Sequence, residues 1–385
     1  MLKIMTPAFL ISALFTFPAI LWAEDSPEKI FEHVPNENDH QIIWNIGEQD
    51  QSANEFALYP DGFERFKYED FGYEDKFFAI GYHEEGEGIP YVLPGPVDTW
   101  GGTWPTSGWR SNQVTILFAA DEEPASGDYT LYIELADYAK EFLPLVKVSV
   151  NDQDERIALE AEGYDRETQP SPARNEDFVD EAALKGDYSE ATPITLTIPI
   201  DQGVIEKNGN QVMITILAGS WIKFDQIRLE GPELKLRHAE KLFVRDVRPA
   251  EYQVTKDQDV FQPLLIETEH LEGAPLLSVE LDGELIFEDT VEMGQYDFEA
   301  LMPAVYQPVT SEVTILADGR ALESDTVERS PQKPQTLAGY VDTRMGAAHA
   351  RWMYAPGPWM PFSMVKLSPV NQNAGWQAGY DSIFE

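Results

Sequence analysis

Tyr129-Thr-Leu-Tyr-Ile-Glu-Leu135 alternates apolar and polar side chains with a period of two, as a strand with one buried face does. Further segments of this kind run from about residue 41 to residue 232 without helical periodicity, at 114–118, 146–150, 194–198, 212–216 and 221–224. Residues that favour turns separate them at Ser126-Gly127-Asp128, Asn151-Asp152, Asn208-Gly209 and Gly219-Ser220. We therefore expect an all-β fold that begins with a jelly-roll-like β-sandwich over residues 24–233.

One stretch of this region lacks the strand rhythm. Residues 155–191 are rich in Glu, Asp, Pro and Arg. We interpret them as a long, poorly ordered excursion of the sandwich, with short helical turns possible at 175–184.

A second β region covers residues 234–334, with strands expected at 263–268, 276–281 and 313–316. Asp282-Gly283 and Asp318-Gly319 stand between apolar runs, which predicts two tight hairpins. About seven short strands in roughly one hundred residues suit an immunoglobulin-like or fibronectin-like sandwich. Ser330-Pro-Gln-Lys-Pro334 then has the composition of a linker.

The chain is strongly acidic. Its 385 residues include 68 acidic and 27 basic side chains, a formal charge of −41. This charge repels nucleic acid and anionic membranes and disfavours polyanionic substrates, whereas neutral glycans and divalent cations remain suitable partners.

The first 23 residues have the pattern of a secretory signal. Lys3 precedes an apolar run, and Ala23 is followed at once by Glu24 and Asp25. We expect cleavage near Ala23 and a secreted or periplasmic protein. The sequence has no cysteine, so its stability has to come from core packing rather than from disulfides.

Two motifs near the ends of the first sandwich carry a family likeness. Ile43-Trp-Asn-Ile-Gly-Glu-Gln-Asp50 and Trp221-Ile-Lys-Phe-Asp-Gln-Ile-Arg-Leu229 resemble the start and the end of the carbohydrate-binding-module-like domain III of polysaccharide lyase family 4. The resemblance implies an accessory sandwich without lyase chemistry. In the second β region, the sequences Leu281-Asp-Gly283 and Met302-Pro-Ala-Val305 resemble the spacer that precedes the catalytic domain in some bacterial α-mannosidases.

The last fifty residues carry a third likeness. Tyr340-Val-Asp-Thr-Arg-Met-Gly-Ala347, then Ala355-Pro-Gly-Pro-Trp-Met-Pro-Phe-Ser-Met-Val365, then Gly375-Trp-Gln-Ala-Gly-Tyr380 resemble the start of glycoside hydrolase family 92. That family comprises calcium-dependent, inverting exo-α-mannosidases. We expect residues 335–385 to be the truncated start of its first β-sandwich.

The family resemblance implies substrate contacts rather than catalysis in this chain. The Gly375-Trp376 pair matches a position that contacts the substrate, so we expect Trp376 to stack on a terminal mannose. His349 and Arg351 lie in the matching glycine-rich loop. No catalytic residue is assigned, because the family's acid, base and calcium ligands lie mainly in a downstream helical domain. The metal ligands of this chain stay unknown.

A tryptophan cluster offers another glycan contact. Trp100, Trp104 and Trp109 lie in a loop rich in Gly, Pro, Ser and Thr, and flat rings stack on the apolar face of sugars. The alternative is that the rings cap the sandwich core. His83-Glu-Glu-Gly-Glu87 places a histidine beside carboxylates, which we interpret as a surface loop rather than a metal site.

Three functional interpretations follow. The first is the accessory region of a secreted α-mannosidase that binds a neutral, mannose-containing glycan and is inactive by itself. The second is a stand-alone, non-catalytic glycan-binding protein. The third is a structural or adhesive β-sandwich protein.

Overall fold

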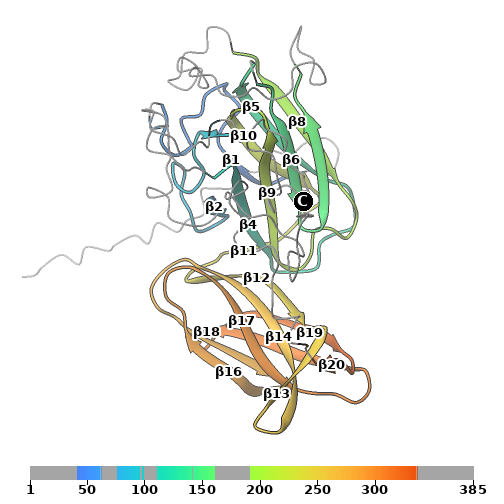
Figure 1. Cartoon of the computed structure of the whole chain (residues 1–385). Helices are drawn as coiled ribbons and strands as arrows, with labels where there is room; N and C mark the ends of the chain where they lie inside the picture. The colour runs from blue at the N-terminus through green and yellow to red at the C-terminus, as the bar shows by residue number, and fades with distance from the viewer. Residues whose placement is uncertain are drawn as a thin grey trace, which may run out of the picture. The chain divides into compact units, whose positions relative to one another are not determined.

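The computed structural model describes residues 41–60, 62, 76–95, 98, 111–140, 142–160, 191–334 and 336 (Figure 1). All regular structure in this part of the chain is strand, so the expected all-β fold is confirmed. No helix among the described residues is long and apolar enough to cross a membrane.

The first sandwich consists of two sheets. One has the order β1-β10-β5-β8, with β3 also paired to β10; the strands are β1 (Gln41–Ile46), β3 (Val92–Leu93), β5 (Tyr129–Tyr138), β8 (Ile194–Ile200) and β10 (Ile222–Gly231). The other has the order β11-β4-β9-β6-β7, with β2 beside β4; the strands are β2 (Lys76–Ala79), β4 (Gln113–Ala120), β6 (Leu145–Val150), β7 (Gln153–Ala158), β9 (Asn208–Ala218) and β11 (Leu236–Arg237).

Alternation along these strands builds the core between the two sheets. Leu131, Ile133 and Leu135 of β5 are fully buried, and they join the hydrophobic cluster that includes Ile214 and Ile216 of β9. The predicted strands 114–118, 129–135, 146–150, 194–198 and 212–216 all lie within observed strands. Of the segment predicted at 221–224, residues 222–224 form the start of the longer strand β10.

Turn residues act as their chemistry predicts. Asn151 has a φ of 46° between β6 and β7, and Gly219 has a φ of 83° between β9 and β10. A Cβ atom on Gly219 would lie 2.3 Å from the carbonyl oxygen of Leu143, so both its backbone angle and its surroundings require glycine. Asn208 has a φ of 73°, but it begins β9 instead of forming a separate turn.

The interpretation of residues 155–191 as one irregular excursion is wrong at its start. Strand β7 continues to Ala158 and pairs in register with β6, with Lys147 opposite Arg156 and Val148 opposite Glu155. The strand is charged because it is the last strand of its sheet path, with most of its side chains exposed to solvent. Residues 161–190, including the helical turns expected there, lie outside the described residues.

The second sandwich also has two sheets around one core. The first has the order β12-β14-β13-β20, with β17 also paired to β14; its strands are β12 (Leu242–Pro249), β13 (Tyr252–Lys256), β14 (Asp259–His270), β17 (Gln295–Pro303) and β20 (Lys333–Pro334). The second has the order β16-β15-β18-β19; its strands are β15 (Leu276–Leu281), β16 (Glu284–Thr290), β18 (Val309–Ala317) and β19 (Arg320–Arg329).

Both predicted hairpins are confirmed. Asp282 and Gly283 have φ angles of 52° and 82° between β15 and β16, and Asp318 and Gly319 have 50° and 79° between β18 and β19. Two consecutive residues with positive φ match the twist of antiparallel strands. The expected start of a third sandwich at 335–385 falls outside the described residues, apart from residue 336.

Residues 238–241 connect β11 to β12. Strands before and after this connection contact each other directly. Arg237 forms an ion pair with Glu323 of β19 at 3.1 Å. Phe243 of β12 joins a buried apolar cluster with Ala79, Leu117 and Ala119. The Arg237–Glu323 pair therefore ties β11 to β19 in a partly buried setting.

Candidate functional site

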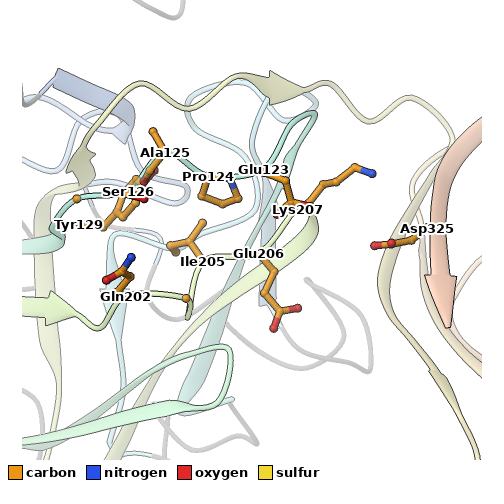
Figure 2. A pocket seen from close by; sticks show the side chains of 12 residues that line it. Glu123, Pro124, Ala125, Ser126, Tyr129, Gln202, Ile205, Glu206, Lys207 and Asp325 are labelled. Carbon is orange, nitrogen blue, oxygen red and sulfur yellow. The ribbon is translucent and has the colours of Figure 1, made fainter. Parts of the chain in front are cut away.

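Two loops of the first sandwich border a pocket of about 360 Å³ (Figure 2). One loop follows β4 and the other follows β8. The lining residues are Glu123, Pro124, Ala125, Ser126, Gly127, Tyr129, Gln202, Gly203, Ile205, Glu206, Lys207 and Asp325. The lining of the pocket is therefore mostly polar.

Carboxylates dominate the charges in this pocket. Burial raises the pKa of Glu206 above its ordinary value, and the negative charges of Asp152, Asp325 and Glu123 raise it further. The one lysine of the lining, Lys207, donates a hydrogen bond from Nζ to the carbonyl oxygen of Ser324 at 3.2 Å. An anionic ligand would be repelled from this pocket.

The aromatic ring in the lining is not available for stacking. Tyr129 is 4% exposed, and its hydroxyl donates to the carbonyl oxygen of Ala125 at 3.2 Å. Its ring lies so close to Gly231 that a Cβ atom there would be 2.3 Å from the Tyr129 Cδ1 atom. The pocket can therefore offer hydrogen bonds to a small polar molecule but no flat apolar platform for a sugar.

No metal centre is visible in the part of the chain that the structure describes, where no group of three His, Asp or Glu side chains is arranged to hold an ion. His83, proposed above as part of a surface loop, is half-buried and turned inward. Its Nδ1 accepts a hydrogen bond from the Ala79 amide at 2.9 Å, and the ring contacts Phe77, Phe78 and Tyr82. Burial lowers the pKa of His83. The histidine is thus a structural residue of its turn.

The expected tryptophan platform lies outside the described residues, as do Trp100, Trp104 and Trp109 themselves. The described residues before it show how that segment is anchored. Asp98 accepts hydrogen bonds from the Gly95 amide at 2.9 Å and from the Ser220 hydroxyl at 2.7 Å. Since Asp98 is buried, these bonds fix the chain beside the start of β10.

Close to this anchor, β10 carries a lysine that sequence reasoning missed. Lys223 is fully buried, and its Nζ lies 5.6 Å from the ring centroid of Tyr59 and 5.7 Å from that of Tyr91. Burial lowers its pKa to about 8, opposed in part by the negative charge of Asp137. The sequence sign that could have pointed to it is a single lysine between apolar residues in Trp221-Ile-Lys-Phe224. With no exposure, Lys223 is not placed to meet a ligand at the surface.

The second set of predicted contacts, Trp376, His349 and Arg351, also lies outside the described residues. The structure therefore leaves their expected roles as predictions.

The first sandwich matches a known family of domains. Residues 42–229 match the family described as polysaccharide lyase family 4, domain III, which is carbohydrate-binding-module-like. The match begins in β1 and ends in β10, so it covers the first sandwich almost completely. The resemblance stated from the motifs at 43–50 and 221–229 is confirmed to this extent.

No curated protein matches the chain. Among solved structures, a GH2 β-galacturonidase from Eisenbergiella tayi bound to galacturonate matches with a TM-score of 0.21 and 9% identity, over 56% of this chain and 35% of that one. A β-glucuronidase from Ruminococcus gnavus matches with a TM-score of 0.18 and 10% identity, over 57% and 34%. The chain thus spans about a third of these enzymes, and scores this low support no functional argument.

Proposed function

We propose that this chain is a carbohydrate-binding accessory region of a glycan-degrading enzyme. The observation that carries the proposal is the match of residues 42–229 to a carbohydrate-binding-module-like domain. The sandwich architecture supports it, because the strands hold polar side chains rigidly on their solvent faces while alternate residues fill the core.

The charge of the chain indicates which glycans it takes. A formal charge of −41 disfavours the binding of acidic polysaccharides, whereas neutral sugars are not repelled. The pocket of Figure 2 adds carboxylates to this acidic surface. We therefore propose a neutral glycan as ligand, and mannose-containing glycans in particular, because of the sequence likeness at 340–380.

That likeness supports the finer proposal of an exo-α-mannosidase of glycoside hydrolase family 92. Trp376, His349 and Arg351 would contact the substrate, and the catalytic carboxylates would come from another part of the enzyme, as the family resemblance implies. Calcium would serve that catalytic part, as the family resemblance implies. The signal pattern of residues 1–23 supports export to the periplasm or the medium.

Retention by an immobilised neutral polysaccharide tests the binding function. The full chain is expected to be retarded in native gels that contain α-mannan and to migrate normally in gels that contain polygalacturonate. Bovine serum albumin, also acidic, serves as the control for retardation by the gel alone. Normal migration in α-mannan and in a panel of other neutral polysaccharides would favour the structural interpretation.

A second measurement tests the accessory role. The purified chain, with calcium present, is expected to release no p-nitrophenol from p-nitrophenyl-α-mannoside, because the catalytic carboxylates are proposed to lie elsewhere. Calcium-dependent turnover by these residues alone would contradict the accessory role while leaving glycan binding intact.

A further inference from the structure

The outer face of the sheet β1-β10-β5-β8 carries an ordered array of polar side chains. Directly paired residues of antiparallel strands share a face, so the register defines two rows. One row runs Asn45, Arg228, Tyr132, Thr197, and the next runs Gln226, Glu134, Thr195. The alternate residues, among them Ile227, Ile133 and Leu196, are buried in the core. We call this polar array the Arg228 face.

Arg228 organises this face from its centre. Its Nε donates to Glu230 at 2.7 Å, and its Nη1 donates to Gln226 at 2.9 Å and also to Glu134. Its guanidinium lies over the Tyr132 ring, 4.5 Å from the centroid. These contacts hold the planar group in one orientation, so little side-chain entropy is left to lose when a ligand binds.

Two groups on the face retain unused hydrogen-bonding capacity. Within the described part of the chain, Nη2 of Arg228 and Oε2 of Glu134 have no hydrogen-bond partner. Neither atom is among the completely buried atoms without a partner, although only 15% of the Arg228 side chain and 5% of the Glu134 side chain is exposed. Because Nη1 of Arg228 already bonds Oε1 of Glu134, the free donor and the free acceptor belong to one linked pair.

A donor and an acceptor on two directly bonded groups suit two neighbouring hydroxyls of a sugar, which can accept from one and donate to the other. Burial lowers the pKa of Arg228, but the hydrogen bonds and charges of Glu134 and Glu230 raise it more, so the guanidinium stays charged. One arginine against two carboxylates leaves the cluster net negative, which suits a neutral sugar and opposes a uronate.

The face also has the extent of an oligosaccharide site. With strands spaced by about 4.8 Å, the row across four strands is roughly 14 Å long and the row across three strands roughly 10 Å. Thr195 and Thr197, at the β8 end of the rows, are exposed and add hydroxyl groups there. The pocket of Figure 2, by contrast, has Tyr129 as the aromatic residue of its lining, and that ring is buried.

We propose that the Arg228 face is where the first sandwich binds a neutral oligosaccharide, which lies across the strands and is held by Arg228 and Glu134. This inference rests on the proposed glycan-binding function and adds the place and the contacts.

Calorimetric titration of the full chain with neutral trisaccharides, mannotriose, cellotriose and xylotriose, tests the inference. Arg228→Lys keeps the charge but loses the planar fork, and we expect its Kd for the best trisaccharide to rise at least tenfold. Thr197→Lys places a long side chain over the row on an exposed edge strand that tolerates lysine, and the same rise is expected. If Arg228→Lys does not fold, Thr197→Lys decides alone.

Matched controls separate this inference from the proposed function. Thr255→Lys adds the same charge at an exposed strand position of the second sandwich, and Lys207→Ala alters the pocket; both are expected to bind as the unaltered chain does. Loss of binding in Lys207→Ala with unchanged binding in Thr197→Lys would overturn the inference and leave the function intact. Tighter binding of trigalacturonate than of every neutral trisaccharide would overturn it too. Absence of any binding by the unaltered chain would overturn both.

Discussion

Replacing Trp44 by alanine is expected to lower the free energy of unfolding by about 3–5 kcal/mol, because the change leaves a large cavity in the first core. Trp44 of β1 is fully buried and lies 5.7 Å from the Phe118 ring of β4, so it bridges the two sheets. Urea unfolding followed by far-UV circular dichroism measures the change.

Trp44→Phe is the matched control for this substitution. It keeps an aromatic ring in the core and removes the indole Nε1, a buried donor that has no hydrogen-bond partner in the described structure. The smaller cavity and the loss of an unsatisfied donor oppose each other, so we expect a change of less than about 2 kcal/mol. An alanine variant as stable as the phenylalanine variant would show that Trp44 does not fill the core.

The second large effect concerns the pH dependence of stability. Burial raises the pKa of Glu323 to about 7 despite its ion pair with Arg237. The folded state therefore binds a proton between about pH 4.5 and 7 that the unfolded state has already released, so stability falls as pH rises through this range. A shift of this size corresponds to about 3 kcal/mol.

Glu323→Gln is expected to remove this fall, because the amide stays neutral in the folded protein at every pH. The variant and the original chain should have similar melting temperatures at pH 5, and the variant should melt at the higher temperature at pH 8. Glu328→Gln, an exposed glutamate on the same strand, is the control and should follow the original chain. Parallel curves for all three proteins would contradict the assignment.

Local patterns predicted nine of the twenty strands that the structure describes, because alternation and turn chemistry are properties of short segments. The hairpins at Asp282 and Asp318 are examples, since two residues suffice to set their geometry. The sequence contains no local pattern that predicts which distant segments pair with each other. β2 runs parallel to β4, and β20 runs parallel to β13, although neither pair is joined by a short connection.

The Arg228 face shows most clearly what the sequence alone cannot predict. Alternation in β10 predicts that Gln226, Arg228 and Glu230 face outward, but it does not say what lies beside them. Only the register of β10 with β5 brings Arg228 against Tyr132 and Glu134. Likewise, Lys223 and Asp225 are buried, and the register between β10 and β5 shifts at the residues around them. The predicted tryptophan and carboxyl-terminal contacts remain predictions.

The charged strand β7 has a consequence for the behaviour of the protein at high concentration. An open sheet margin presents unpaired amides and carbonyls on which another chain can continue the sheet, and repeated addition produces fibrils. Asp154, Glu155 and Arg156 crowd this margin with charge, so a second copy docking there would have to desolvate them. For a chain that cannot be locked by disulfides, such protection helps keep it dispersed.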